Sequence, residues 1–154
     1  MLTLNLQIAL SKIYFIPKKT DFERWLKFVY FPIFLNKRIS VNIRLVEKHE
    51  SIRLNEYFCN KKHFSDVLSF PFEYPIIPQK KSSILLGDIV ICPEVLENKI
   101  KISKKIFEEY WAHIVIHSAL HLVKYDHKSL KDANIMENIE IKLMKKLGYN
   151  NPYL

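Results

Sequence analysis

The sequence predicts an α+β fold, in which a single domain is formed by a mixed β-sheet packed with helices. Segments with the two-residue alternation of a strand interleave with segments of helical periodicity along the 154 residues. Several connections between them are short, which favours a mixed sheet over a purely parallel one. Residues 111–123 are apolar on nearly every side, as in a buried helix. Because this length suits one hydrophobic core and no linker or repeat divides the chain, we expect one domain over residues 1–154.

A strand and a helix are predicted at the N-terminus. The strand is indicated by inward-facing apolar residues at every second position, namely Leu2, Leu4, Leu6 and Ile8. After Pro17, residues 20–23 read Thr-Asp-Phe-Glu, a capping box whose Thr20 and Glu23 side chains would satisfy N–H groups of the first helical turn. The helix is expected to continue through Val29 and to be ended or distorted by Pro32.

Strands and helices are predicted to alternate again in the middle of the chain. The alternation of apolar residues at 41, 43 and 45 predicts a second strand, and helical spacing over residues 51–58 predicts a short helix. Residues 66–73 are expected to form a third strand. Residues 74–83, with two prolines and two lysines, are expected to form a loop. The near-continuous apolar run 84–92 predicts a strand covered on both faces.

Three helices are predicted after this strand. Pro93 suits the first position of a helix that extends through Ile100. A second helix, which carries several histidines, is expected to begin near Ser103. A last amphipathic helix is expected over about residues 129–147, followed by Gly148, where a helix end favours a residue with positive φ.

The composition favours an intracellular protein with a polyanionic partner. The formal net charge is +8, and nucleic acid fits this charge better than a membrane does because no amphipathic anchor is present. No apolar run approaches the roughly 18 residues of a membrane span, and the alternating N-terminus is unlike a signal peptide. Cys59 and Cys92 suggest neither a disulfide framework nor a metal-ligand pair. We therefore expect a cytoplasmic protein.

Three histidines form the clearest candidate site. His117, His121 and His127 have the spacing H-x3-H-x5-H. Residues four apart on a helix share a face, so His117 and His121 are expected to point at one metal ion, and His127 joins them if the chain turns back after His121. Three imidazoles with a fourth position for water are typical of a catalytic zinc site, although they suit other divalent ions too.

Other interpretations of the polar residues in this segment stay open. The histidines would be core residues if each ring had a hydrogen-bond partner, and for His113 this is the favoured interpretation, with a supporting role next to the metal ligands as the alternative. Asp126 could orient a histidine or cap the turn. Ser118 stands where the zinc-peptidase motif H-E-x-x-H has its glutamate base, which disfavours a peptidase.

The segment HSALHLVKYDH at 117–127 resembles H-G-x-L-H-L-x-G-Y-D-H, the signature of the YbeY family of bacterial rRNA maturation factors. Further segments resemble other blocks of that family in the same order: 54–55, 66–73, 86–94, 133 with 136–137, and 147–153. The resemblance implies a zincin-like fold and a single-strand-specific, metal-dependent endoribonuclease that acts in 70S ribosome quality control and in maturation of the 16S rRNA 3′ terminus.

The resemblance also implies a set of site residues and partners. The metal ligands would be His117, His121 and His127, holding one divalent ion, with zinc favoured. No catalytic group is assigned beyond the water that this metal would bind. The expected partners are ribosomal RNA and the small ribosomal subunit, with no membrane and no obligate protein partner. Independently of the resemblance, the pairs of basic residues along the chain make Lys61, Lys62, Lys80 and Lys81 candidates for contact with the RNA backbone.

The chain departs from the family pattern at four positions. Ser118 and Lys124 replace glycines, and a left-handed Lys124 would cost on the order of 1 kcal/mol. Cys59 replaces a functionally important arginine and Lys62 replaces an aspartate. Because cysteine cannot bind phosphate in the two-pronged manner of arginine, we expect slower cleavage. The alternative function is a ribosome-assembly, RNA-binding factor with weak or lost catalysis.

Overall fold

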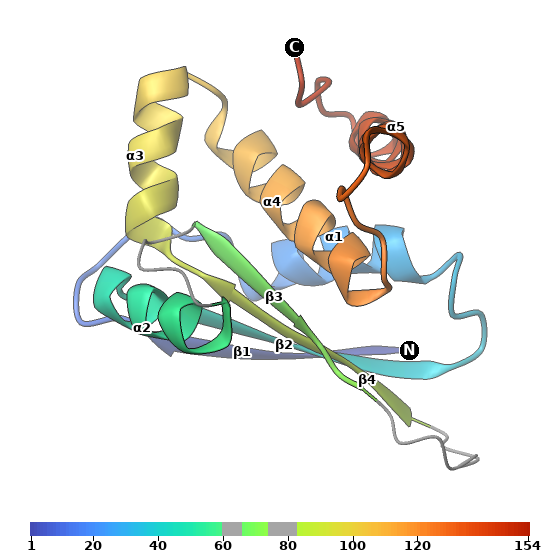
Figure 1. Ribbon diagram of the computed structural model, residues 1–154, viewed down its shortest axis with the longest axis horizontal. Helices are drawn as coiled ribbons and strands as arrows, with labels where there is room; N and C mark the ends of the chain where they lie inside the picture. Colours follow the sequence, from blue (N-terminus) through green and yellow to red (C-terminus); the bar gives the residue numbers. More distant parts are fainter. Residues whose placement is uncertain (60–65, 74–82) are drawn as a thin grey trace.

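A four-stranded mixed sheet organises the fold in the computed structural model, which describes residues 1–59, 66–73 and 83–154 (Figure 1). The strands lie in the order β1 (Leu2–Ala9), β2 (Arg38–Val46), β4 (Ser83–Ile91) and β3 (Val67–Pro71). β1, β2 and β4 are parallel, whereas β3 pairs antiparallel with β4 at the edge of the sheet. The predicted α+β architecture with a mixed sheet is confirmed.

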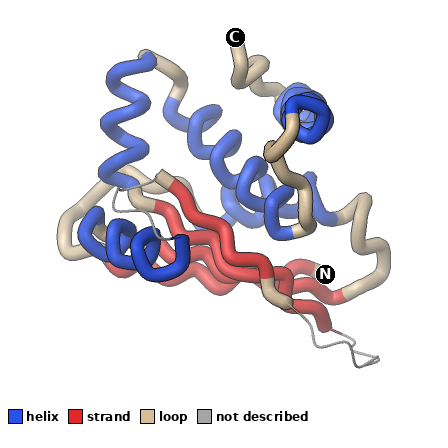
Figure 2. Tube along the Cα trace, viewed as in Figure 1, coloured by secondary structure: helices blue, strands red, loops and turns tan. Residues whose placement is uncertain are grey.

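Helices cover both faces of the sheet (Figures 1 and 2). α1 (Lys19–Tyr30) and α4 (Phe107–Leu122) pack on one face, and α2 (Lys48–Cys59) packs on the other. α3 (Pro93–Ser103) follows β4, and α5 (Leu130–Lys146) packs against α4. α4 is therefore enclosed between the sheet, α1 and α5, as its apolar sequence predicts.

Alternate residues of β4 show how the two faces divide the core. Ile89 and Ile91 belong to the main core beneath α1 and α4, whereas Val90 belongs to a smaller cluster on the α2 side. In the main core the buried rings of Trp25 and Trp111 both meet Phe22 edge to face, with centroids 5.8 and 5.9 Å apart. This packing fixes α1 and α4 relative to each other.

The cap of α1 differs from the prediction. Lys18 is the N-cap, and its backbone N–H donates to the Asp21 carboxylate (3.0 Å). The predicted box of Thr20 and Glu23 was wrong because Asp21, three residues after Lys18, already fills the acidic position of the box. The helix ends at Tyr30, before Pro32, as expected. The inward placement of Ile8 was also wrong, since this residue lies near the end of an edge strand and is 56% exposed.

The start of α4 was predicted too early. α3 continues to Ser103 and ends where Lys104 adopts a left-handed conformation (φ 56°), so the histidine-bearing helix begins only at Phe107. α2 begins three residues earlier than predicted. The loop expected at 74–83 lies outside the described residues except for Ser83, which begins β4.

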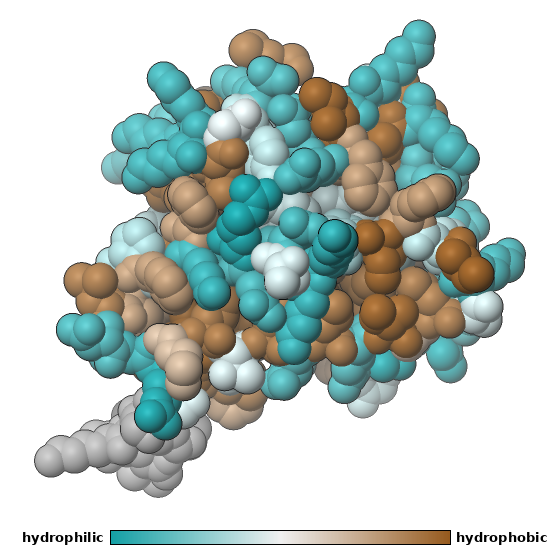
Figure 3. All heavy atoms as spheres, turned by 180° about the vertical axis from the view of Figure 1, so that it is seen from behind, coloured by the Kyte–Doolittle hydropathy of each residue, from teal (hydrophilic) through white to brown (hydrophobic). Residues whose placement is uncertain are grey.

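The surface is mixed in character. On the face seen from behind, hydrophobic side chains lie among hydrophilic ones (Figure 3). Phe28 and Phe31, at the end of α1, are examples of large side chains that stay exposed. Among the helices of the described residues, none has the length and apolar character needed to cross a membrane.

Candidate metal centre

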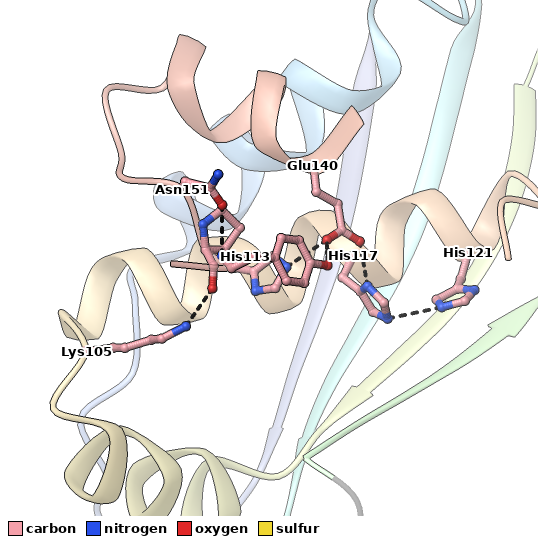
Figure 4. Close-up of polar contacts among 8 residues, drawn as sticks. Lys105, His113, His117, His121, Glu140 and Asn151 are labelled. Atoms are coloured by element: carbon pink, nitrogen blue, oxygen red, sulfur yellow. Dashed lines mark hydrogen bonds and ion pairs between the residues drawn. The ribbon is translucent and has the colours of Figure 1, made fainter. Parts of the chain in front are cut away.

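Three histidines come together at the C-terminal end of α4. The ligand nitrogens of His117, His121 and His127 all lie within 4.8 Å of one another. The Nε2 atoms of His117 and His121 are 3.1 Å apart (Figure 4), and the rings of His121 and His127 have centroids 5.1 Å apart. The structure thus brings together the three histidines singled out by their spacing.

The turn after α4 brings His127 back to the helix. The N–H of Lys124 donates to the carbonyl of His121 (3.0 Å), and the N–H of Tyr125 donates to the carbonyl of Leu120 (3.1 Å). Lys124 has φ 75°, the left-handed conformation expected if the chain reverses here. These bonds satisfy helix-end carbonyls and direct the chain towards His127.

Asp126 caps this turn. Its carboxylate accepts the backbone N–H of His127 at 2.7 Å, and this bond, aided by neighbouring positive groups, lowers the pKa of Asp126. The same carboxylate lies 3.8 Å from Nδ1 of His127, which is longer than a hydrogen bond. Of the two roles considered for Asp126, the geometry favours the turn cap.

A buried carboxylate on α5 supports the histidines from behind. Glu140 is fully buried, and its two oxygens lie 2.6 Å from Nδ1 of His117 and 2.8 Å from Nε2 of His113 (Figure 4). The hydroxyl of Tyr153, from the C-terminal segment, donates to the same carboxylate. Burial raises the pKa of Glu140, but the hydrogen bonds from His113, His117 and Tyr153 outweigh it and lower the pKa to about 2. Glu140 is therefore ionised at neutral pH.

Glu140 determines which nitrogen of His117 is available. An ionised carboxylate accepts hydrogen bonds only, so His117 donates from Nδ1 and its Nε2, which faces His121, is left as an acceptor. Such carboxylate contacts are common behind metal-binding histidines because they fix the ring and its tautomer. His113 is held by the same carboxylate through its Nε2 atom.

The surroundings of His121 favour the neutral form of its ring. Burial lowers the pKa of His121 below its ordinary value, and the two neighbouring imidazoles of His117 and His127 act in the same direction because a second positive charge beside them is unfavourable. A neutral imidazole is the form that binds metal ions. Two sets of described residues could hold a metal ion by their spacing: His117 with His121 and His127, and His113 with His117 and Glu140.

A cleft opens beside the three histidines. It has a volume of about 420 Å³ and lies between the edge strand β3 and the end of α4. Residues 67–71 form one wall, and the other is formed by the histidines together with Lys124, Tyr125 and Asp126. The three histidines therefore line a cleft beside the edge strand β3.

Ser118 does not lie where it could take part in catalysis. Its side chain is fully buried, and its hydroxyl has no hydrogen-bond partner within the part of the chain that the structure describes. It therefore does not face the cleft as the glutamate of a zinc peptidase would, in agreement with the sequence interpretation.

Replacing Ser118 with alanine is expected to stabilise the protein by about 1 kcal/mol, because it removes a buried hydroxyl without a partner and favours the helix. Urea unfolding followed by circular dichroism measures the change. Ser51→Ala is the matched control, since Ser51 is also buried but has an interaction partner. Destabilisation by Ser118→Ala comparable to that of the control would contradict this account of the hydroxyl.

Some predicted site residues lie outside the described part of the chain. They are the four lysines suggested for RNA contact, Lys61, Lys62, Lys80 and Lys81. The sequence reasoning in turn missed Glu140 and Tyr153. A signal for Glu140 was present, because Met136, Glu140 and Met144 are spaced by four and form a buried stripe in which one member is a carboxylate.

Comparison with known proteins identifies relatives along nearly the whole chain. The family model described as endoribonuclease YbeY matches residues 11–148. The protein called endoribonuclease YbeY from Buchnera aphidicola subsp. Cinara cedri is 40% identical over 153 residues, which cover 99% of this chain and 96% of that one. The protein of the same name from Blochmanniella floridana is 38% identical over 146 residues, covering 95% and 92%.

A solved structure has a similar fold. The solution structure of TM1509 from Thermotoga maritima superposes with a TM-score of 0.54 at 22% sequence identity, covering 94% of this chain and 91% of that one. This similarity supports the α+β fold described above.

Proposed function

Because the chain belongs to the YbeY endoribonuclease family, we propose that it is a metal-dependent endoribonuclease that hydrolyses phosphodiester bonds in single-stranded RNA. The observation that carries this proposal is the convergence of three histidine nitrogens on one cleft, with a buried carboxylate fixing one of the rings. The family name supports RNA as the substrate, and the formal net charge of +8 suits a polyanion.

We assign the metal to His117, His121 and His127 rather than to the set that includes Glu140. Two ligands of a tetrahedral zinc ion, each about 2.0–2.1 Å from it, lie about 3.3 Å apart. The Nε2 atoms of His117 and His121 are close to this separation at 3.1 Å. The contacts of Glu140 at 2.6 and 2.8 Å are instead hydrogen-bond distances. Three imidazoles fit zinc, which is the ion we propose.

The residues of the cleft have distinct roles in the proposed reaction. When bound, the divalent ion would lower the pKa of a water to about 7 and polarise a phosphoryl oxygen. His117, His121 and His127 would hold the ion, and Glu140 keeps the proton of His117 on Nδ1. β3 supplies one wall of the cleft, and the RNA strand would lie against it. The turn capped by Asp126 holds His127 in place.

We further propose a role in the ribosome. The substrate would be the 3′ terminus of 16S rRNA, within the small subunit and during late quality control of the 70S ribosome, which places the protein in the cytoplasm. The resemblance of the histidine segment and of the other blocks to the rRNA maturation family supports this role. Residues 1–154 would act as one hydrolase domain.

RNA cleavage by the purified protein tests the proposal. An end-labelled single-stranded fragment from the 3′ end of 16S rRNA should be cut, and the same fragment annealed to its complement should be resistant. Chelation should abolish cleavage, and adding back zinc should restore it. Cleavage that persists after the metal has been removed completely would contradict a metal-dependent mechanism.

Cys59 gives one specific reason to consider an RNA-binding factor with weak catalysis, since the resembled family has an arginine there. If well-folded, metal-loaded protein binds the fragment without cutting it, binding is the function that remains. Cys59→Arg then asks whether a missing positive charge accounts for the difference. Cleavage gained by Cys59→Arg would show that the site is otherwise competent.

A further inference from the structure

Lys124 lies in the cleft beside the three histidines. It lines the same cavity of about 420 Å³ as His117, His121 and His127, and its side chain is exposed to solvent. Of the described residues that line this cavity, Lys124 alone is a lysine or arginine. Among the described residues that line the cleft, Lys124 is therefore the one with a permanent positive charge.

The charge of Lys124 is available to a ligand. No carboxylate among the described residues forms an ion pair with it, whereas the neighbouring Lys128 lies 3.6 Å from Asp126. Asp126 is thus already engaged by Lys128 and by the N–H of His127. An anion in the cleft would meet the ammonium group of Lys124 without competition from these neighbours.

The backbone at Lys124 is unfavourable for a lysine. Its φ of 75° is in the left-handed region, where glycine is the residue without a penalty. The turn that ends α4 and returns the chain to His127 imposes this conformation. Lys104 has the same conformation (φ 56°), but it ends α3 and does not line the histidine cleft.

We propose that Lys124 binds a phosphate of the RNA strand that occupies this cleft, next to the bond to be cut. This inference rests on the proposed function and adds to it a residue that holds the substrate. The lysine acts as a point charge on a flexible stem, so it can follow the phosphate without fixing the base sequence.

Binding of a labelled single-stranded RNA as a function of salt tests this inference, with fluorescence anisotropy as the readout. The test variant is Lys124→Asn, because asparagine tolerates the left-handed conformation and lacks the charge. At 0.1 M monovalent salt the affinity should fall about fivefold, and the slope of log K against log salt should become shallower by about 0.7, the contribution of one phosphate contact in single-stranded RNA. Lys124→Arg should retain both the affinity and the slope.

Lys104→Asn is the matched control, since it removes the same charge from the same backbone conformation outside the cleft. An equal change of slope in Lys124→Asn and Lys104→Asn, or no change in Lys124→Asn, would overturn the inference while leaving the proposed function intact. If the wild-type protein neither binds nor cuts RNA, both this inference and the proposed function are overturned. Lys124→Gly separates strain from charge, because it should raise the melting temperature by about 2–4 °C while weakening RNA binding as Lys124→Asn does.

Discussion

Replacing His121 with alanine is expected to abolish metal binding and RNA cleavage while leaving the fold intact. His121 is the cleanest ligand to remove, because His117 also satisfies the buried Glu140. With two imidazoles left, metal affinity should fall by more than about 100-fold, the upper end of the losses seen when a residue behind a ligand is changed. Metal content after dialysis and cleavage of the rRNA fragment measure the two effects.

Thermal unfolding separates a lost ligand from a lost fold. Free metal at 100 times its Kd should stabilise the wild-type protein by about 2.7 kcal/mol, and this gain should disappear in His121→Ala. His49→Ala, at an exposed position on α2, is the control and should behave like the wild type. A His121→Ala protein that keeps the metal-dependent stabilisation would show that the ion is held elsewhere, and the set of His113, His117 and Glu140 would be the next one to test.

Periodicity was sufficient to predict that these segments form strands and helices. Apolar alternation in β1 and β2, and the continuous apolar run of β4, reflect how many faces each strand buries, which is a local property of the sequence. Helix boundaries were less predictable because single backbone interactions determine them. Asp21 moved the start of α1, and the left-handed Lys104 delayed α4.

In the candidate site too, features set by the local sequence could be predicted, whereas features set by the packing of distant segments could not. His117 and His121 are four residues apart on one helix, so their common direction could be predicted from the helix alone. The partnership of His117 with Glu140 joins residues 23 positions apart and depends on how α5 packs against α4, which no local pattern encodes. Tyr153 reaches Glu140 only because the C-terminal segment returns over α4, where the carbonyl of Pro152 accepts from Lys105 (2.6 Å, Figure 4).

Glu140→Gln is expected to weaken metal binding by about 10- to 100-fold without removing any ligand. A glutamine has one acceptor oxygen where the carboxylate has two, so it cannot accept from both His117 and His113. His117 would then lose the partner that keeps its proton on Nδ1, and the nitrogen facing His121 would be a ligand for only part of the time. Stability should also fall by about 1–3 kcal/mol, because buried charge-assisted hydrogen bonds are lost.

Two further variants distinguish this role of Glu140 from a general effect of charge on α5. Glu137→Gln removes a carboxylate from the preceding turn and should leave metal affinity unchanged, since Glu137 has no hydrogen bond or ion pair with the described residues. Tyr153→Phe removes one donor to Glu140 but leaves its contacts with both histidines, so its effect should be smaller than that of Glu140→Gln. Titration of each protein with zinc in competition with a chelator gives the affinities. If Glu140 acts through His117, the loss of zinc affinity should be largest in Glu140→Gln, smaller in Tyr153→Phe and absent in Glu137→Gln. Equal losses in Glu140→Gln and Glu137→Gln would mean that α5 acts on the metal through its overall charge.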